Sequence, residues 1–161
     1  MMAARPKILL AFSQRVYEGY VDPEQLARLE KFADWEHFPC EGGGIYDTNT
    51  DPAAAEALRE KLVDFDGIVT CHGSPTLTPH VLENAPKLLI IGELEGDRFA
   101  SRIDLDAAWE RNIRTVDVTN GSSYPVAEWA LGLILVGMRN GGYLFQRILE
   151  GKANEIRYGQ I

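Results

Sequence analysis

The sequence predicts an α/β protein with a flavodoxin-like five-stranded parallel sheet, helices on both faces, and a long C-terminal apolar helix. Several short runs are apolar without alternating polar residues, which is typical of strands buried on both faces. These runs alternate along the chain with segments of helical spacing. Strands and helices that alternate in this way form parallel sheets through right-handed connections, so a doubly covered sheet is the simplest arrangement.

Five segments have the length and apolar character of such strands. The first, Lys-Ile-Leu-Leu-Ala-Phe, is continuous, the second is short and weakly marked, and the fourth runs into Gly92. The predicted strands cover residues 7–12, 35–38, 67–71, 88–91 and 114–118.

Helix starts between these strands are marked by residues that can cap free backbone N–H groups. Asp22, Asp51 and Thr78 are each followed by a proline, which suits the first turn of a helix. A fourth helix is expected to begin at Asp104 or Asp106. Residues 40–50 contain three consecutive glycines and are predicted to form a loop.

Residues 123–140 predict one long helix, capped by Ser122 or Ser123 with Pro125 in the first turn. Between residues 126 and 138 only Glu128 is charged, so the helix is apolar nearly all round and needs more than one neighbour to bury it. The predicted sheet already has helices for both faces. We therefore expect a flavodoxin-like domain over residues 1–120, and a helix and tail over residues 121–161 that pack against a partner.

Composition excludes several classes of function. The chain has 161 residues and a net charge of −8, which argues against a nucleic-acid backbone as partner. Its most apolar segment is too short to cross a bilayer, and no secretory signal precedes the first strand. Two cysteines form no disulfide framework. We expect no membrane partner and a cytoplasmic location.

Ligands of open parallel sheets bind at the carboxyl ends of the strands, which nominates the loops at residues 13–15, 71–74, 92–98 and 120–123. Cys71 and His72 are expected on opposite faces of a strand and so form no nucleophile–base pair. The histidines and cysteines show no metal-ligand spacing. A phosphate loop is excluded because Glu93, Glu95 and Asp97 would repel a phosphate and no Gly-x-Gly-x-x-Gly occurs. A receiver domain is excluded because it needs acidic residues after the first and third strands.

The ordered motifs between residues 65 and 152 resemble those of the D-isomer-specific 2-hydroxyacid dehydrogenase family. A strand, a polar loop and a short helix lead to Ala-Pro-Lys-Leu at residues 85–88, and then to a strand that ends in glycine. Residues 103–116 are similar to the family's next helix and strand. Residues 124–133, Arg139-Asn140 and residues 150–152 are similar to its long interdomain helix and the segment after it.

This resemblance implies an enzyme that moves a hydride between NAD or NADP and a small 2-hydroxy or 2-keto acid. It also implies that backbone amides at His72, Gly73 and Ser74, and from Gly92 and Glu93 onward, hold the substrate carboxylate. The chain departs from the family pattern in two places. Carboxylates replace a glycine-rich run after residue 92, and would weaken binding unless they point away, and His72 stands where arginine or serine is common.

The family's dinucleotide fingerprint and catalytic residues lie beyond the matched segments. We therefore assign no catalytic, cofactor-binding or metal-binding residue, and expect a substrate-side fragment that is inactive and binds no cofactor alone. The resemblance further implies a homo-oligomer formed through residues 124–150. The alternative is a non-catalytic binding or assembly module that reuses the same fold. The acid substrate and the choice between NAD and NADP stay open.

Overall fold

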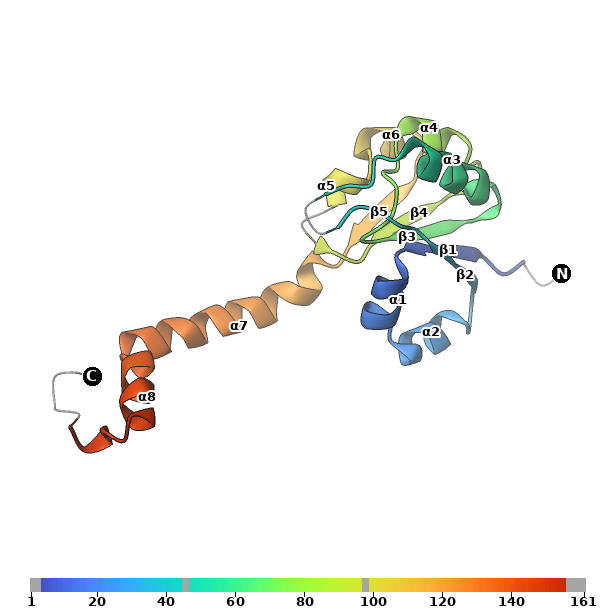
Figure 1. The fold of residues 1–161 in the computed structure, drawn as a ribbon. Helices are drawn as coiled ribbons and strands as arrows, with labels where there is room; N and C mark the ends of the chain where they lie inside the picture. Colours follow the sequence, from blue (N-terminus) through green and yellow to red (C-terminus); the bar gives the residue numbers. More distant parts are fainter. Residues whose placement is uncertain (1–3, 45–46, 97–98, 156–161) are drawn as a thin grey trace. The chain divides into compact units, whose positions relative to one another are not determined.

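The computed structural model describes residues 4–44, 47–96 and 99–155. Backbone contacts divide the chain into two compact units, residues 1–119 and 120–161 (Figure 1). The first unit contains the sheet, and the second contains most of a long helix and the shorter helical segments after it. Each unit is described by itself.

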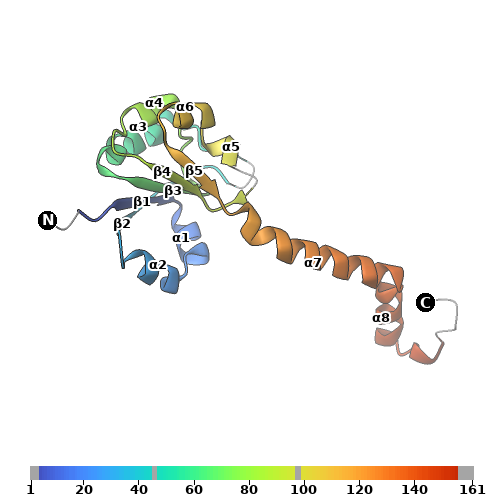
Figure 2. The same cartoon turned by 180° about the vertical axis from the view of Figure 1, so that it is seen from behind.

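The first unit is built on a parallel five-stranded sheet in the order β2-β1-β3-β4-β5, which confirms the predicted flavodoxin-like fold (Figure 2). Every neighbouring pair is parallel, and the register places Leu9 of β1 beside Glu36 on one side and Ile68 on the other. The strands are β1 (Lys7–Phe12), β2 (Asp34–Pro39), β3 (Gly67–Thr70), β4 (Ile90–Glu93) and β5 (Arg114–Asp117).

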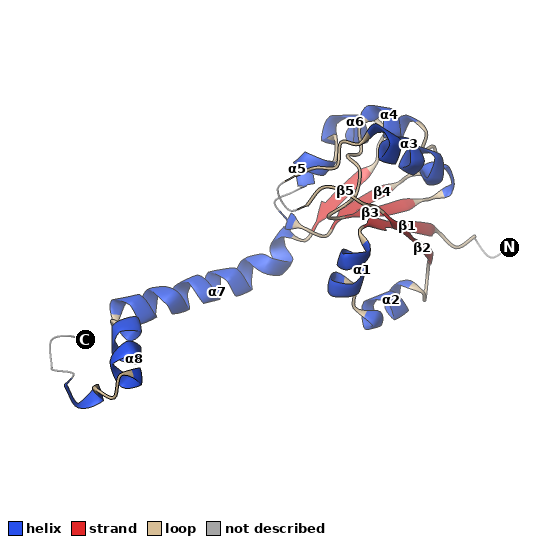
Figure 3. Ribbon diagram, in the orientation of Figure 1, coloured by secondary structure: helices blue, strands red, loops and turns tan. Residues whose placement is uncertain are grey.

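Helices lie on both faces of this sheet, as predicted, with α1 and α2 on one face and α3, α4 and α6 on the other (Figure 3). The helical elements of this unit are α1 (Gln14–Tyr20), α2 (Pro23–Leu29), α3 (Pro52–Lys61), the 3₁₀ turn η1 (Leu62–Asp64), α4 (Pro79–Glu83), α5 (Phe99–Arg102) and α6 (Leu105–Glu110).

Side chains of β1 alternate between two apolar clusters, one on each face. Leu9 and Ala11 belong to the larger cluster with Leu58 of α3, whereas Leu10 and Phe12 belong to a smaller cluster with Val16 of α1. Burial of both faces explains why this strand is a continuous apolar run rather than an alternating one.

The predicted caps are confirmed by hydrogen bonds. Asp22, Asp51, Thr78 and Asp104 each accept a hydrogen bond from a backbone N–H in the first turn of the following helix. Two helices of the described residues were not predicted, α5 and α1, and α1 begins directly after β1, where a loop is expected. Ser13 caps it, but only Val16 is buried along its length, so no apolar stripe reveals it in the sequence.

The fourth strand is displaced from its predicted range of residues 88–91. β4 covers Ile90–Glu93, because its register with β3 places Gly67 beside Ile90 and Thr70 beside Glu93. Leu89 lies outside the strand and is 65% exposed, whereas the Glu93 side chain is buried. A carboxylate therefore occupies a strand position that the apolar pattern alone assigns to a loop.

The second unit consists of α7 (Thr119–Met138), whose first residue lies in the first unit, α8 (Gly141–Leu149) and the 3₁₀ turn η3 (Ala153–Glu155). The predicted helix start at Ser122 or Ser123 is wrong, since α7 begins at Thr119, whose N–H donates to Asp117. Pro125 therefore lies inside the helix and not in its first turn. No helix in the described part of the chain is long and apolar enough to span a bilayer.

Candidate functional site

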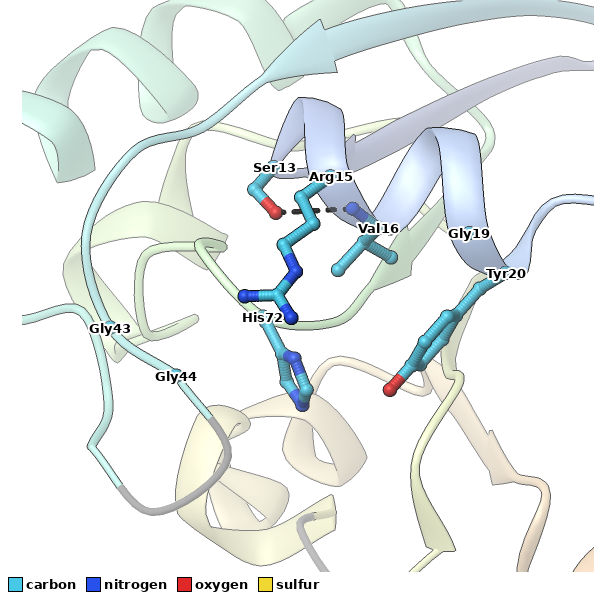
Figure 4. Close-up of a pocket in the computed structure, with 8 residues that line it drawn as sticks. All are labelled: Ser13, Arg15, Val16, Gly19, Tyr20, Gly43, Gly44 and His72. Carbon is cyan, nitrogen blue, oxygen red and sulfur yellow. Dashed lines mark hydrogen bonds between the residues drawn. The ribbon is translucent and has the colours of Figure 1, made fainter.

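A cavity of about 610 Å³ opens at the carboxyl ends of β1 and β3 (Figure 4). This is the edge of a parallel sheet at which ligands bind, because the loops after the strands converge there. The cavity is lined by Ser13, Arg15, Val16, Gly19, Tyr20, Gly43, Gly44 and His72. Arg15 and Tyr20 come from α1, and His72 comes from the loop after β3.

The loops around this cavity are joined by backbone hydrogen bonds. The N–H of Ser13 donates to the carbonyl of His72 at 2.9 Å, and the N–H of Cys40 donates to the carbonyl of Phe12 at 3.2 Å. The Ser13 hydroxyl accepts the N–H of Val16 at 3.3 Å and so fixes the start of α1. These contacts hold the segments after β1, β2 and β3 against one another.

Gly73 makes this close approach possible. Its φ is +91°, a conformation that side chains disfavour, and a Cβ at this position would lie 2.5 Å from the carbonyl oxygen of Cys40. The same Cβ would lie 3.0 Å from the backbone nitrogen of Ser13. Only glycine therefore allows the loop after β3 to pass between the other two loops.

A buried ion pair lies next to the loop that carries His72. The Glu93 carboxylate accepts hydrogen bonds from the Thr70 hydroxyl at 2.8 Å and from the Arg102 guanidinium at 2.7 Å. Glu93 and Arg102 are 1% and 2% exposed. Burial raises the pKa of Glu93, while the hydrogen bond from Thr70 and the charge of Arg102 oppose that shift.

Arg102 also connects this pair to the cavity. Its guanidinium donates to the Glu95 carboxylate at 3.2 Å and to the carbonyl of Gly44, in the cavity wall, at 3.0 Å. The other Glu95 oxygen lies 2.5 Å from Nε2 of His72. Glu93 and Glu95 therefore bind the Arg102 guanidinium, and Glu95 also binds the His72 imidazole. Because both carboxylates are paired with basic groups, they need not weaken the binding of an acid. Asp97 lies outside the described residues.

The residues predicted to bind substrate lie in different surroundings. His72 lines the cavity, and Gly73 follows it in the turn. Ser74 is buried; its hydroxyl donates to the carbonyl of Pro75 and its N–H to the carbonyl of Cys71. Gly92 lies within β4 between Val69 and Val116, and Glu93 is buried against Arg102. Their binding roles stay predictions.

Arg15, Tyr20 and Arg102 are the side chains that sequence reasoning did not single out. Arg15 lies in the nominated loop after the first strand, but without the fold no observation connects it to His72. Arg102 contacts Glu93, Glu95 and Gly44, which are 9, 7 and 58 residues away. No local pattern could have revealed those contacts.

The predicted placement of Cys71 and His72 on opposite faces is wrong. The Cys71 sulfur, a ring nitrogen of His72 and a carboxylate oxygen of Glu95 all lie within 4.8 Å of one another. β3 ends at Thr70, so strand alternation does not extend to these residues.

This cluster has neither a reactive thiol nor a preformed metal site. Burial raises the pKa of Cys71 to about 12, so the thiol is protonated near neutral pH. The 2.5 Å separation of His72 and Glu95 is a hydrogen bond, whereas two ligands of one zinc ion lie about 3–4 Å apart. Arg102, bound to Glu95, would also repel a cation.

Comparisons with known proteins identify the family of this chain. Residues 16–155 match the family model described as D-isomer specific 2-hydroxyacid dehydrogenase, catalytic domain. The D-3-phosphoglycerate dehydrogenase of Methanocaldococcus jannaschii is 39% identical over 85 residues, which are 53% of this chain and 16% of that protein. The chain therefore spans a small part of this relative.

Two solved structures show the same fold. The chain superimposes on a protein of Pyrococcus horikoshii OT3 with a TM-score of 0.63 and 29% identity, over 92% of this chain and 38% of that one. It also superimposes on an NAD-dependent formate dehydrogenase of Staphylococcus aureus, solved in complex with NAD, with a TM-score of 0.56 and 24% identity. That match covers 91% of this chain and 41% of the other. The chain thus belongs to the D-isomer-specific 2-hydroxyacid dehydrogenase family.

Proposed function

We propose that this chain is the substrate-side domain of an NAD(P)-dependent oxidoreductase that acts on 2-hydroxy or 2-keto acids. The cavity at the carboxyl ends of β1 and β3 receives the acid, whose carboxylate lies near His72 and Gly73. The observation that supports this role is the lining of the cavity. Among the residues described there, basic and neutral side chains are present and no carboxylate is.

Hydride transfer requires a nucleotide, which we expect a separate cofactor-binding domain to hold. The 161 residues contain no Gly-x-Gly-x-x-Gly, and the cavity presents no arrangement typical of a dinucleotide site. NAD or NADP would supply the hydride from a cofactor-binding domain. The residues of this chain would bind and orient the acid and exclude water from one side of it.

Substrate binding without turnover is the expected behaviour of the purified chain. D-Lactate should shift the backbone amide NMR signals of Ser13, His72 and Gly73, because these groups surround the cavity. NADH should not bind in equilibrium dialysis, and a mixture with glyoxylate should leave NADH unconsumed. Oxidation of NADH by the chain alone would contradict the proposed inactivity. Amide shifts confined to other surfaces would contradict the proposed site.

Association through residues 124–150 is part of this proposal. On α7, Tyr124, Trp129 and Leu133 are 77%, 71% and 54% exposed, and the apolar residues surround the helix. So large an apolar surface favours packing against another copy of the chain. The rival proposal, a non-catalytic assembly module, uses the same surface but predicts that no acid binds in the cavity.

Light scattering of the purified chain is therefore expected to give the mass of a dimer or larger oligomer. Trp129→Glu combined with Leu133→Glu should convert it to a monomer, because charges would then lie in the apolar contact. Phe32→Glu is the matched control: it places a charge on an apolar residue of the first unit that is 61% exposed. A monodisperse wild-type monomer would disprove this association.

A further inference from the structure

The cavity of about 610 Å³ is lined by basic and neutral side chains in an otherwise acidic chain. The net charge of the protein is −8, yet the ionisable side chains described along the cavity are Arg15, Tyr20 and His72. The carboxylate that contacts this wall, Glu95 against His72, is shared with Arg102. A site of this character attracts anions.

The two basic groups of this cavity differ in their bonding. His72 is held by Glu95, and its ring also contacts Tyr20 edge-on, with 5.9 Å between the ring centroids. Arg15 is exposed and, among the described residues, makes no ion pair or hydrogen bond. Glu18, on the same helix, accepts a hydrogen bond from Gln14 instead. The guanidinium of Arg15 is therefore available to a ligand.

Arg15 and His72 come from segments that follow different strands, and both face the same cavity (Figure 4). A volume of about 610 Å³ exceeds what a two- or three-carbon acid fills, since whole ligand pockets for larger molecules begin near 300 Å³. An acid bound by its carboxylate near His72 and Gly73 therefore leaves room for a further group that reaches toward Arg15.

We propose that Arg15 is a specificity-determining residue that binds a second anionic group of the substrate. The substrate class is then a 2-hydroxy or 2-keto acid that carries a second carboxylate or a phosphate. A guanidinium suits either group, because its planar array of N–H donors forms two parallel hydrogen bonds with neighbouring oxygens. The inference rests on the proposed function, since it assumes that the first carboxylate binds near His72.

The test is a comparison of affinities, measured by amide NMR titration of the full chain. D-Malate and 3-phospho-D-glycerate should each bind about tenfold more tightly than D-lactate, the gain expected from one charge-assisted contact. The tighter of the two identifies carboxylate or phosphate as the preferred second group. Arg15→Gln should remove this about tenfold preference, because it weakens the binding of D-malate and 3-phospho-D-glycerate more than it weakens the binding of D-lactate.

Arg28→Gln is the matched control, because it removes the same charge from α2 at a residue that does not line the cavity. It should leave all three affinities unchanged. If Arg15→Gln weakened the binding of D-lactate as much as the binding of D-malate, or weakened the binding of neither acid, the proposed role of Arg15 would be overturned.

Succinate separates this inference from the proposed function, since it has two carboxylates and no 2-hydroxyl group. Weaker binding of succinate than of D-malate supports both the second-anion site at Arg15 and the proposed function. Succinate that binds as tightly as D-malate, with the same loss in Arg15→Gln, would support the second-anion site and contradict a 2-hydroxy acid substrate. D-Lactate that binds in the cavity as tightly as D-malate would support the proposed function and overturn the inference.

Discussion

Replacing Arg102 with methionine is expected to lower the free energy of unfolding by about 3–5 kcal/mol, as measured by urea denaturation at neutral pH. The substitution leaves the Glu93 carboxylate, which is 1% exposed, without its counter-charge. It also removes the hydrogen bonds from Arg102 to Glu95 and to the carbonyl of Gly44, so this side chain no longer holds the cavity wall in place. Arg102→Lys should recover part of the loss, because an ammonium group cannot reach all three acceptors in the same geometry.

The pH dependence of this loss identifies its cause. Burial raises the pKa of Glu93, and removal of Arg102 should raise that pKa further. A carboxyl group whose pKa is raised in the folded state stabilises the fold at pH values below the ordinary glutamate pKa. This stabilisation is lost as the pH rises through the pKa of the folded state. The deficit of Arg102→Met should therefore shrink as the pH falls toward 4 and below.

The double variant Arg102→Met with Glu93→Gln is the control, because it removes both charges. It should regain most of the stability at neutral pH. A deficit that is the same at every pH, or the same in the double variant, would show that lost packing is responsible and not an uncompensated carboxylate.

Gly73→Ala should also cost about 2–5 kcal/mol, from the sum of a left-handed backbone strain and a steric overlap. The added Cβ would lie 2.5 Å from the carbonyl oxygen of Cys40, which is backbone and cannot rotate away. The loop after β3 must then shift and carry His72 with it. The NMR signals of the cavity residues should change together with the urea midpoint.

Gly19→Ala is the matched control for that substitution. Gly19 lies in α1 and lines the same cavity, but a Cβ there would meet no atom within 4 Å. Because alanine favours a helix over glycine, this variant should be up to about 1 kcal/mol more stable than the wild type. A Gly73→Ala protein as stable as the wild type would show that the three loops pack less closely than their hydrogen bonds indicate.

Much of the fold was predictable because its signals are local. The continuous apolar run at Lys7–Phe12 indicates a strand buried on both faces, and the caps at Asp22, Asp51 and Thr78 mark helix starts within a few residues. The alternation of these elements leads to the parallel sheet, and the ordered motifs after residue 65 lead to the family. In each case the residues that carry the signal are neighbours in the sequence.

The candidate site was only partly predictable. The rule that ligands bind beyond the carboxyl ends of parallel strands led to the loops that contain Ser13 and His72, and both line the cavity. The rule does not say which side chains turn toward the ligand. Ser74 and Glu93, nominated with His72, are buried instead.

By itself, the sequence determined the five strands, most of the helices between them and the family to which the chain belongs. Only the tertiary structure decided that Glu93 is paired with Arg102, that Glu95 holds His72, and that Arg15 faces the same cavity. The physical reason is the separation along the sequence of the residues that interact. Apolar periodicity and capping depend on residues within one turn or one strand, whereas ion pairs and cavities depend on groups that meet only after the sheet has formed.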